Sequence, residues 1–427
     1  MTTTHALHSL SKQTTRMEDY DPTAMSVMQA QQFIRQFLNP VIEVETLPLR
    51  ESLGRVLAAD IVSPAQVPNY DNAAMDGFAF HADDVNTSSL KVIGIAFAGT
   101  PFDGVVGLGQ CVRIMTGAMM PQGTNTVVMQ EHVRLEGDVI YLMSNPKPHA
   151  NVREAGEDLK FGQAVLSASH RMLAADLGLI ASLGVAEVCV YKPLKVAIFS
   201  TGDELVQLGK PLGVGQVYDS NRYTLFGMLK RLGVELIDLG AIADDPAMLE
   251  KTLLNAARLA DVVITSGGVS VGEADYMKHL LTQHGQVMFW KINMKPGRPL
   301  AYGKIQYNTE KSAHYFGLPG NPVAVMVTFY QFVSAALITL MGGFAKPLPM
   351  FTVQCVQAIK KAAGRTEFQR GILFEDAGVW KVKPTGAQGS AILSSMSQAN
   401  CFIVLAEEVG NLEAGTWVQV QVLEGVV

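Results

Sequence analysis

The sequence contains few cysteines, and those it has are scattered along the chain. Its four cysteines are Cys111, Cys189, Cys355 and Cys401, and none forms a CxxC pair or a cluster with histidine. This scatter argues against a zinc site and against a disulfide framework. The cysteine pattern is typical of a reducing cytoplasm.

The sequence also has no continuous apolar run near the roughly 20 residues that span a bilayer, and no apolar signal segment at its polar N-terminus. Its net charge is -6, which does not support nucleic-acid binding, because nucleic-acid-binding proteins usually carry a basic face. We therefore expect a cytoplasmic protein that binds neither membrane nor nucleic acid.

Motifs of several large enzyme classes are missing as well. The chain has no GxGxxG, no GxxxxGK[ST], and no Ser/His/Asp or Cys/His set in a motif context. Hydride transfer on a dinucleotide fold and a P-loop NTPase are therefore disfavoured. What is present is ordinary for a globular protein: 427 residues, 48% hydrophobic and 17% charged, enough for two to four domains.

The first half of the chain contains three kinds of sequence pattern: a polar tail, segments with helical periodicity and a stretch of short alternating runs. Residues 1–24 are rich in Thr, Ser and Gln and are predicted to be disordered. Helical spacing of apolar residues predicts helices over 26–38 and 171–183. Between them, residues 45–150 form short alternating runs typical of a β-rich insert. We predict its strands over residues 91–96, 110–115, 125–130 and 139–143.

From Lys195 onwards, strands and helices alternate. This order predicts a parallel α/β sheet with right-handed crossovers, whose ligands bind at the carboxyl ends of the strands. The segments STGDE, DLGAIADD and TSGGVSVGEAD are all expected at that edge. A last helix is expected over residues 329–341. The tail from Pro349 alternates again and indicates a small β-barrel or sandwich.

The segment Val262–Tyr276 combines a buried strand with a glycine-rich loop. The backbone N–H groups of Ser266, Gly267 and Gly268 could wrap closely around an anion, because glycine has no Cβ. Glu273 and Asp275 follow, and carboxylates facing an anion make sense if Mg²⁺ bridges them. A tight strand-to-helix turn with solvated acids is the alternative interpretation.

Two neighbouring loops strengthen the anion hypothesis. The stretch WKINMKPGRP carries Lys291, Lys295 and Arg298 around a Pro-Gly turn in an otherwise acidic chain. Lysine and arginine side chains both bind phosphate oxygens. The loop GLPGNP, with Pro319 and Pro322, opens a helix whose N-terminus favours negative charge. A solvated basic turn and a rigid helix start are the plainer alternatives.

A second set of acids is expected at strand and loop ends on one side of the sheet. Taken singly, each is more typical of a helix cap or a solvated loop than of a metal ligand. The set consists of Asp203, Glu204, Asp219, Asp244 and Asp245.

The insert and the tail offer further polar loops. The apolar loop Pro68–Ala79, which carries Asp76, should close over something. Thr116 in MTGA and Asp158 in REAGED lie in two other loops, for which domain packing is the alternative. In the tail, Arg365, Arg370 and Ser390 would suit an anion at a domain boundary, although exposed arginines are common.

Nine motifs in order resemble the molybdopterin molybdenumtransferases, the MoeA family that includes the gephyrin E domain. They are DNAAMDG, IMTGA, REAGEDL, STGDEL, YDSN, TSGGVSVGEADY, KPGRP, GLPGNPV and GAQGS, and the likeness covers residues 26–427. The family's basic turn usually reads KPGKP, so Arg298 keeps the charge of that position with a different geometry.

The resemblance implies a multidomain fold of α/β plus β structure. Its parts would be an N-terminal helical and linker domain (25–44 with 151–190), the β-rich insert (45–150), a molybdopterin adenylyltransferase-like α/β domain (191–342) and a small C-terminal β-barrel (343–427). It also implies a homodimer whose active site is shared between subunits, with the insert loop as a lid supplied in trans. Transient partners would be a molybdopterin adenylyltransferase and maturation factors of molybdoenzymes.

The implied reaction is insertion of molybdate into adenylylated molybdopterin with release of AMP, assisted by Mg²⁺. The metal would be held by Asp275, Asp244 and Glu204. Motif matching assigns catalytic roles to Asp275, Lys291, Lys295, Glu204 and Asp76. Substrate-binding roles fall to Thr116, Asp158, Asp244, Ser266, Gly267, Gly268, Arg298, Pro319, Pro322, Arg365, Arg370 and Ser390.

Two other functions are compatible with parts of the pattern. An adenylyltransferase acting on molybdopterin and ATP would share the SGG loop, but it would lack the insert, the GLPGNP loop and the terminal β domain. A partner-binding scaffold on the same fold would not need the full set of acids and bases. Nothing in the sequence indicates whether the enzyme prefers molybdate or tungstate, and nothing identifies the enzymes that accept its product.

Overall fold

The structure is a computed structural model that describes residues 24–87, 89–268, 274–308 and 311–423, without the side chains of 274–278 and 287–289. The expected disordered tail, residues 1–24, therefore lies almost wholly outside the described part. The chain divides into two compact units. We call Thr46–Leu53 with Leu57–Val190 the insert unit, and the remainder, including Tyr191–Val427, the larger unit. The finer domain boundaries stay predictions.

The insert unit is built mainly from short strands. Its largest sheet has the order β7(Thr126–Met129)-β4(Gly77–Phe80)-β6(Gln110–Ile114)-β5(Leu90–Ala96)-β9(Val139–Leu142)-β8(Val133–Glu136). The expected strands of the insert are confirmed in β5, β6, β7 and β9. Smaller pairs join β2(Ile61–Val62) to β11(Ala164–Leu166) and β3(Asn72–Ala73) to β10(Val152–Arg153), and β1(Val44–Pro48) pairs with β12(Glu187–Tyr191). The expected helix over 171–183 is α3(Ala174–Ser182), which ends before Gly184 in left-handed backbone.

The loop expected over residues 68–79 is in part a central strand. Gly77 pairs with both Ile114 and Met129, so β4 lies between β6 and β7. All four residues of β4 are buried, so the strand lacks the polar alternation by which strands are recognised. A Cβ on Gly77 would lie 1.9 Å from the carbonyl oxygen of Val128, which explains a glycine at this site.

The larger unit contains a six-stranded sheet in the order β16(Glu235–Ile242)-β13(Lys195–Thr201)-β17(Val262–Ser266)-β21(Ser312–Leu318)-β20(Pro299–Gln306)-β18(Gly285–Lys291). The first four strands are parallel, as expected, but β20 runs antiparallel to both of its neighbours. The sheet is therefore mixed. The sequence-based interpretation of residues 290–299 as a single basic turn missed that they finish β18 and begin β20.

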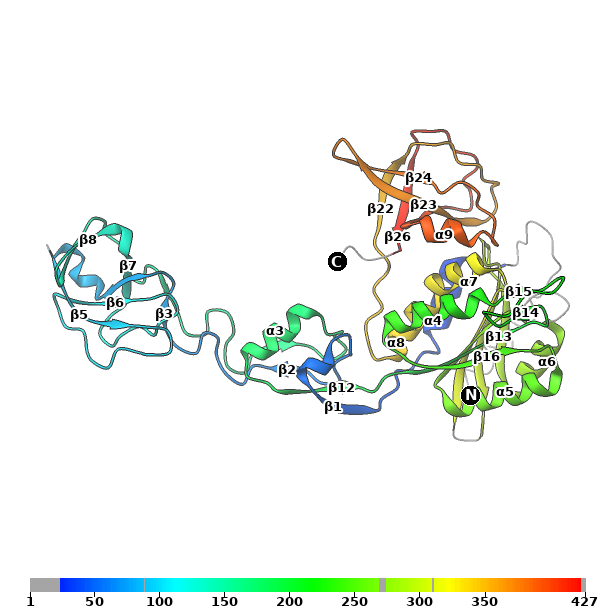
Figure 1. Cartoon of the computed structure of the whole chain (residues 1–427), viewed down its shortest axis with the longest axis horizontal. Helices are drawn as coiled ribbons and strands as arrows, with labels where there is room; N and C mark the ends of the chain where they lie inside the picture. Colours follow the sequence, from blue (N-terminus) through cyan, green and yellow to red (C-terminus); the bar gives the residue numbers. More distant parts are fainter. Residues whose placement is uncertain (1–23, 88, 269–273, 309–310, 424–427) are drawn as a thin grey trace. The chain divides into compact units, whose positions relative to one another are not determined.

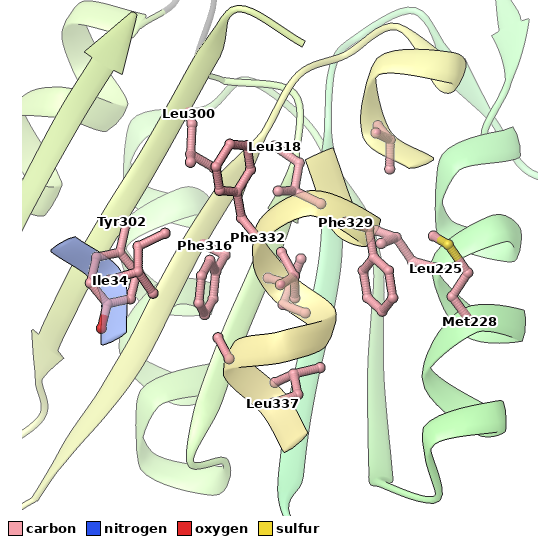
Figure 2. Close-up of a cluster of buried hydrophobic side chains, with 14 of the residues drawn as sticks. Ile34, Leu225, Met228, Leu300, Tyr302, Phe316, Leu318, Phe329, Phe332 and Leu337 are labelled. Carbon is pink, nitrogen blue, oxygen red and sulfur yellow. The ribbon is translucent and has the colours of Figure 1, made fainter. Parts of the chain in front are cut away.

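Side chains on alternate sides of these strands enter two separate cores. In β13, Val196 and Ile198 join one cluster, whereas Ala197 and Phe199 join the other. The first core is covered by α2(Val27–Arg35), α4(Ser220–Leu232) and the helix that begins at Pro322. Figure 2 shows Leu225 and Met228 of α4 on the Phe329 side of the cluster that also contains Phe316 and Leu318 of the sheet. The second core contains residues of α5(Pro246–Leu259) and α6(Ala274–His284). The result is a sheet between two helical layers (Figure 1).

Capping residues lie at the starts of α2, α4 and α5 and at the end of α4. Ser26 forms a capping box with Gln29 at the start of α2. Asp219 and Asp245 accept hydrogen bonds from the first turns of α4 and α5, so the capping interpretation of these two acids is confirmed. Gly233 ends α4 in left-handed backbone.

The helix expected at residue 329 begins earlier, at Pro322. It runs through α7(Pro322–Thr328), a π-helical turn over Phe329–Val333 and α8(Ser334–Leu340). The segment Pro322–Leu340 has the length and mean hydropathy (1.9) of a membrane span, but 67% of its apolar window is buried, as in a core helix. Proline at the first helical position explains the early start, because its missing N–H needs no partner there.

The tail forms the expected barrel. Strands β23(Thr366–Asp376), β24(Val379–Pro384), β22(Met350–Cys355), β26(Trp417–Val422) and β25(Cys401–Leu405) pair in this order, and β25 pairs back with β23 to close the ring. A short helix, α9(Leu393–Gln398), was not expected. The strand β19(Met294–Lys295) pairs with β23 and so attaches the KPGRP segment to the barrel.

Candidate functional site

The carboxyl ends of the parallel strands meet along one edge of the sheet in the larger unit, which we call the carboxyl edge. Ser200, Ser266 and Leu318 are register partners across β13, β17 and β21. Leu300 precedes Ala301, the pair partner of Gly317, and lies opposite Trp290, so Lys291 emerges at the same edge. The STGDE, SGG, GLPGNP and KPGRP segments are therefore neighbours; the predicted topology places STGDE and SGG at this edge.

Asn221 in the first turn of α4 ties two of these segments together. Its Nδ2 donates to Oγ of Ser266 at 2.7 Å and to the carbonyl oxygen of Gly320 at 2.6 Å. Ser266 is 2% exposed. A side chain from a third segment thus fixes the end of β17 against the GLPGNP loop.

The SGG loop is tightly enclosed at Gly267. Its N–H already donates to the carbonyl oxygen of Leu318 at 3.2 Å, so this amide is engaged in the sheet. A Cβ at this position would lie 2.7 Å from the carbonyl oxygen of Thr201, and the residue has a φ of 91°. Glycine is therefore required here for close packing. The amide of Gly268, not that of Gly267, remains the candidate donor to an anion.

The predicted acids occupy the ends of β13 and β16. The backbone N–H of Asp244 donates to Oδ1 of Asp203 at 3.0 Å, which joins the two loops. Asp203 and Glu204 are exposed, and Asp244 is half-buried. Among the described residues no group of three His, Cys, Asp or Glu side chains is arranged to hold a metal ion by itself.

Asp219 has a different role from these acids. It is buried and accepts from Ser200 Oγ at 3.1 Å and from Arg222 Nε at 3.0 Å. Arg222 also contacts both carboxylate oxygens of Asp238. Burial acts to lower the pKa of Arg222, but the hydrogen bonds to Asp219 and Asp238 outweigh it, and the pKa is raised. This network fixes the start of α4, and Asn221 with it.

The basic turn packs on α7 and on the barrel. A Cβ at Gly297, whose φ is 96°, would lie 2.6 Å from Oγ1 of Thr328 in α7. Lys295 Nζ contacts Oε1 of Glu367 in β23 at 3.2 Å. Lys291 and Arg298 are half-buried at the same edge. The structure thus brings the three predicted cations together at the carboxyl edge.

The GLPGNP loop meets a loop of the barrel. The N–H of Val323, in the first turn of α7, donates to the carbonyl oxygen of Ser390 at 3.0 Å. Pro322, which precedes Val323, therefore lies close to Ser390. The barrel loop satisfies one of the helix N–H groups that have no partner within the helix.

Arg370 supports that barrel loop from inside. It is 1% exposed, and its guanidinium donates to Ser395 Oγ (2.9 Å) and to the carbonyl oxygens of Gly389 (3.0 Å) and Ala387 (3.3 Å). Burial lowers the pKa of Arg370 to about 10. The guanidinium is engaged with the protein itself, so Arg370 is not the exposed surface arginine of the plainer alternative. Arg365 is half-buried near the start of β23.

Two predicted acids fall outside the part of the chain that the structure describes. Glu273 belongs to the segment 269–273. Asp275 lies in the first turn of α6, but its side chain is not described. Their place in the site stays a prediction.

The insert unit carries its own cluster, formed by the three loops that the sequence singled out. Asp76 Oδ1 accepts from both the N–H and the hydroxyl of Thr116, each at 2.7 Å. These hydrogen bonds from Thr116, the backbone one first, hold the pKa of Asp76 below its ordinary value. Asp71 accepts from the N–H of Ala155 at 2.7 Å, which brings in the turn that carries the exposed Asp158.

Two residues of the carboxyl edge were missed by sequence reasoning. Asn221 lies inside the YDSN motif, in which the sequence pattern had singled out Asp219. Glu367 stood between the two tail arginines, and its carboxylate was not considered. The first could have been found from its motif, whereas the second depends on the pairing of β19 with β23.

Three family models together match most of the chain. Residues 25–184 match the MoeA N-terminal region (domain I and II), 197–339 a probable molybdopterin binding domain, and 352–423 the MoeA C-terminal region (domain IV). The molybdopterin molybdenumtransferase of Haemophilus influenzae is 47% identical over 384 residues, covering 89% of this chain and 94% of the relative. The enzyme of the same name from Nostoc is 38% identical and covers 85% of each.

Two further relatives extend the comparison. Gephyrin of Dictyostelium discoideum is 33% identical, with 88% of this chain and 59% of gephyrin covered. Among solved structures, the molybdopterin biosynthesis moeA protein from Pyrococcus horikoshii matches with a TM-score of 0.80 and 29% identity, covering 93% of this chain and all of that one.

Proposed function

This chain belongs to the molybdopterin molybdenumtransferase family, the MoeA family, and on that premise we propose its reaction. The chain is a transferase of molybdenum cofactor biosynthesis. We propose that it takes adenylylated molybdopterin and molybdate and releases AMP as molybdenum enters the pterin. The observation that carries this proposal is the carboxyl edge, where a serine-glycine loop, three cations and several acids lie on neighbouring segments.

We propose that the cations hold the pyrophosphate of the adenylylated pterin. Lys291 and Lys295 supply mobile positive charges, and Arg298 supplies a planar one. Ser266 and the N–H of Gly268 would add short hydrogen bonds to phosphate oxygens. No protein nucleophile is needed, because positioning and charge compensation can lower the barrier to breaking a phosphoanhydride.

We propose that Mg²⁺ binds at this edge, with oxygen ligands from both the protein and the substrate. The donors there are carboxylates of Asp244 and Glu204, with Asp275 proposed from the sequence, and Mg²⁺ prefers oxygen ligands. Mg²⁺ usually takes one or two protein carboxylates and completes its shell with water and phosphate, so a closed three-acid cage is not required. The bound ion would offset negative charge as the phosphoanhydride breaks.

Molybdate is a tetrahedral dianion and needs a compact set of donors. We propose that Arg365 and Ser390 face it, and that Arg370 acts by holding the Ser390 loop. Asp76, Thr116 and Asp158 of the insert would complete the site from the second subunit of a homodimer. We place the enzyme in the cytoplasm, with a molybdopterin adenylyltransferase and molybdoenzyme maturation factors as transient partners.

The test is a turnover assay with purified protein, adenylylated molybdopterin and Mg²⁺. AMP release that depends on added molybdate supports the proposal. Formation of adenylylated pterin from molybdopterin and ATP, without molybdate, would instead identify the adenylyltransferase activity. Asp275→Ala should keep fold and dimer but lose molybdate-dependent AMP release, which a pure scaffold function would not require. Turnover retained in that variant refutes the role proposed for Asp275.

A further inference from the structure

The orientation of the Asn221 amide is fixed by its neighbours. A carbonyl oxygen can only accept a hydrogen bond, so the group 2.6 Å from the oxygen of Gly320 must be the NH₂ end of the amide. This removes the usual ambiguity between amide oxygen and nitrogen. The same NH₂ group lies 2.7 Å from Oγ of Ser266 and gives its second hydrogen to that oxygen.

This orientation determines what the Ser266 hydroxyl can do. Because its oxygen accepts from Asn221, its own hydrogen must point to a different acceptor. The described residues contain no recorded acceptor for that hydrogen, although Ser266 is only 2% exposed. A buried donor without a partner is destabilising, so a site of this kind favours a ligand that supplies an acceptor.

A second buried atom of the same pair points to a ligand. Oδ1 of Asn221 is buried and has no hydrogen-bond partner among the described residues. Side chains that act only as structural ties normally satisfy all their buried polar atoms. Among the described residues, Ser266 therefore keeps a donor unused and Asn221 keeps an acceptor unused. An acceptor-only anion can take the hydrogen of Ser266 but gives no hydrogen to Oδ1 of Asn221, so that oxygen is left for a separate donor such as water.

We propose that Asn221 is a positioning residue for substrate: it holds Ser266 as a hydroxyl donor to an oxygen of the pyrophosphate group. This inference rests on the proposed function, and it specifies that the ligand group at Ser266 is an acceptor-only anion. Asn221 acts through Ser266, while it also ties the GLPGNP loop to β17. Without Asn221, the serine hydrogen could turn to other acceptors, and binding of the anion would weaken.

The test measures equilibrium binding of adenylylated molybdopterin with Mg²⁺ but without molybdate, so that no turnover occurs. Asn221→Ala and Ser266→Ala should each weaken binding about 10- to 100-fold, as expected for loss of a hydrogen bond to a charged group. Because both remove the same interaction, the double variant should bind no more weakly than Ser266→Ala alone. Asn221→Asp keeps the side-chain volume but should bind the adenylylated pterin at least as weakly as Asn221→Ala, because its carboxylate would accept the hydrogen of Ser266.

Asn255→Ala is the matched control, because Asn255 lies on α5 and its recorded contact is with Arg258. It should bind like the wild-type protein. Losses that add in the double variant, or wild-type binding by both Asn221 variants, overturn the inference and leave the proposed function intact. Failure of the wild-type protein to bind the adenylylated pterin overturns both.

Discussion

The ammonium nitrogen of Lys295 lies 3.2 Å from Oε1 of Glu367, and the two residues are also register partners in the pairing of β19 with β23. The side chain of Glu367 is 6% exposed, whereas that of Lys295 is 57% exposed. The other oxygen of Glu367 accepts from Gln369 Nε2 at 2.9 Å. The C-terminal barrel therefore holds a proposed catalytic lysine of the KPGRP segment in place.

Glu367→Gln should lower molybdate-dependent turnover about tenfold, because Lys295 loses its charged partner and samples more positions. The free energy of unfolding should fall by only about 1–2 kcal/mol, since the lysine is mostly solvated. Steady-state kinetics and urea unfolding measure the two effects. Asp376→Asn breaks the more exposed Lys381 pair of the same barrel and should leave turnover unchanged. Equal turnover in both variants would remove Glu367 from the site.

The hydrogen bonds of Thr116 should set the ionisation of Asp76. Thr116→Val keeps the backbone bond and removes the hydroxyl, so the pKa of Asp76 should rise part of the way to its ordinary value; Thr116→Ser should not change it. Because the pKa is lowered in the folded state, this carboxylate stabilises the fold above its ordinary pKa, and the stabilisation is lost as pH falls through the lowered value. NMR titration of the Asp76 carboxyl group measures the pKa in the wild-type protein and in both variants. The same pKa in all three proteins would show that the Thr116 hydroxyl does not lower it.

Buried His314 should make stability depend on pH. Burial, with a smaller effect from Lys304, lowers its pKa from 6.5 to about 4, and its Nδ1 lies 3.3 Å from the hydroxyl of Tyr302. Between pH 6.5 and about 4, His314 is protonated in the unfolded chain but remains neutral in the folded chain. The stabilisation is therefore complete above about pH 6.5 and is lost as pH falls towards 4, by on the order of 2–3 kcal/mol.

Urea unfolding of the wild-type protein and of His314→Gln across this range tests the effect. The difference in unfolding free energy between the two proteins should shrink as pH is lowered from about 6.5 to about 4. His132→Gln, at an exposed histidine, should follow the wild-type curve. A difference between wild type and His314→Gln that stays constant across the range would show that His314 titrates normally.

Substitution of Arg370 should mainly lower stability, whereas substitution of Arg365 should mainly lower activity. Arg370→Met should lower the free energy of unfolding by about 2–4 kcal/mol, because it removes the buried hydrogen bond to Ser395 Oγ together with the bonds to the carbonyl oxygens of Ala387 and Gly389. Arg365→Met should cost less than about 1 kcal/mol but should raise the KM for molybdate. Thermal unfolding and kinetics at varied molybdate concentration measure both. The opposite pattern would mean that Arg370, not Arg365, faces the anion.

Much of the fold could be predicted from periodicity and capping residues. Alternation of apolar residues located β5, β6, β7 and β9, and Asp219, Gly233 and Asp245 marked helix ends. The strand β4 was missed because it is buried on both faces and begins within the loop expected over residues 68–79. The antiparallel β20 was missed because proline and glycine at its start indicated a turn.

The site was predictable to the level of which loops meet, but not of what each side chain contacts. Parallel topology placed the STGDE, DLGAIADD and SGG segments together without any knowledge of contacts. The roles of Asn221 and Glu367 depend on hydrogen bonds to residues 45 and 72 positions away along the chain. Arg370 illustrates the same limit, because its position inside the barrel depends on the Gln388–Ser390 loop folding over it.

The stoichiometry of a single turnover tests the proposed reaction most directly. The purified enzyme is mixed with adenylylated molybdopterin, Mg²⁺ and increasing molybdate, and the AMP released is compared with the molybdenum incorporated into pterin. The proposed reaction predicts one AMP for each molybdenum inserted, and negligible AMP release without molybdate. AMP release that is equally fast without molybdate, or molybdenum insertion without AMP release, would contradict it.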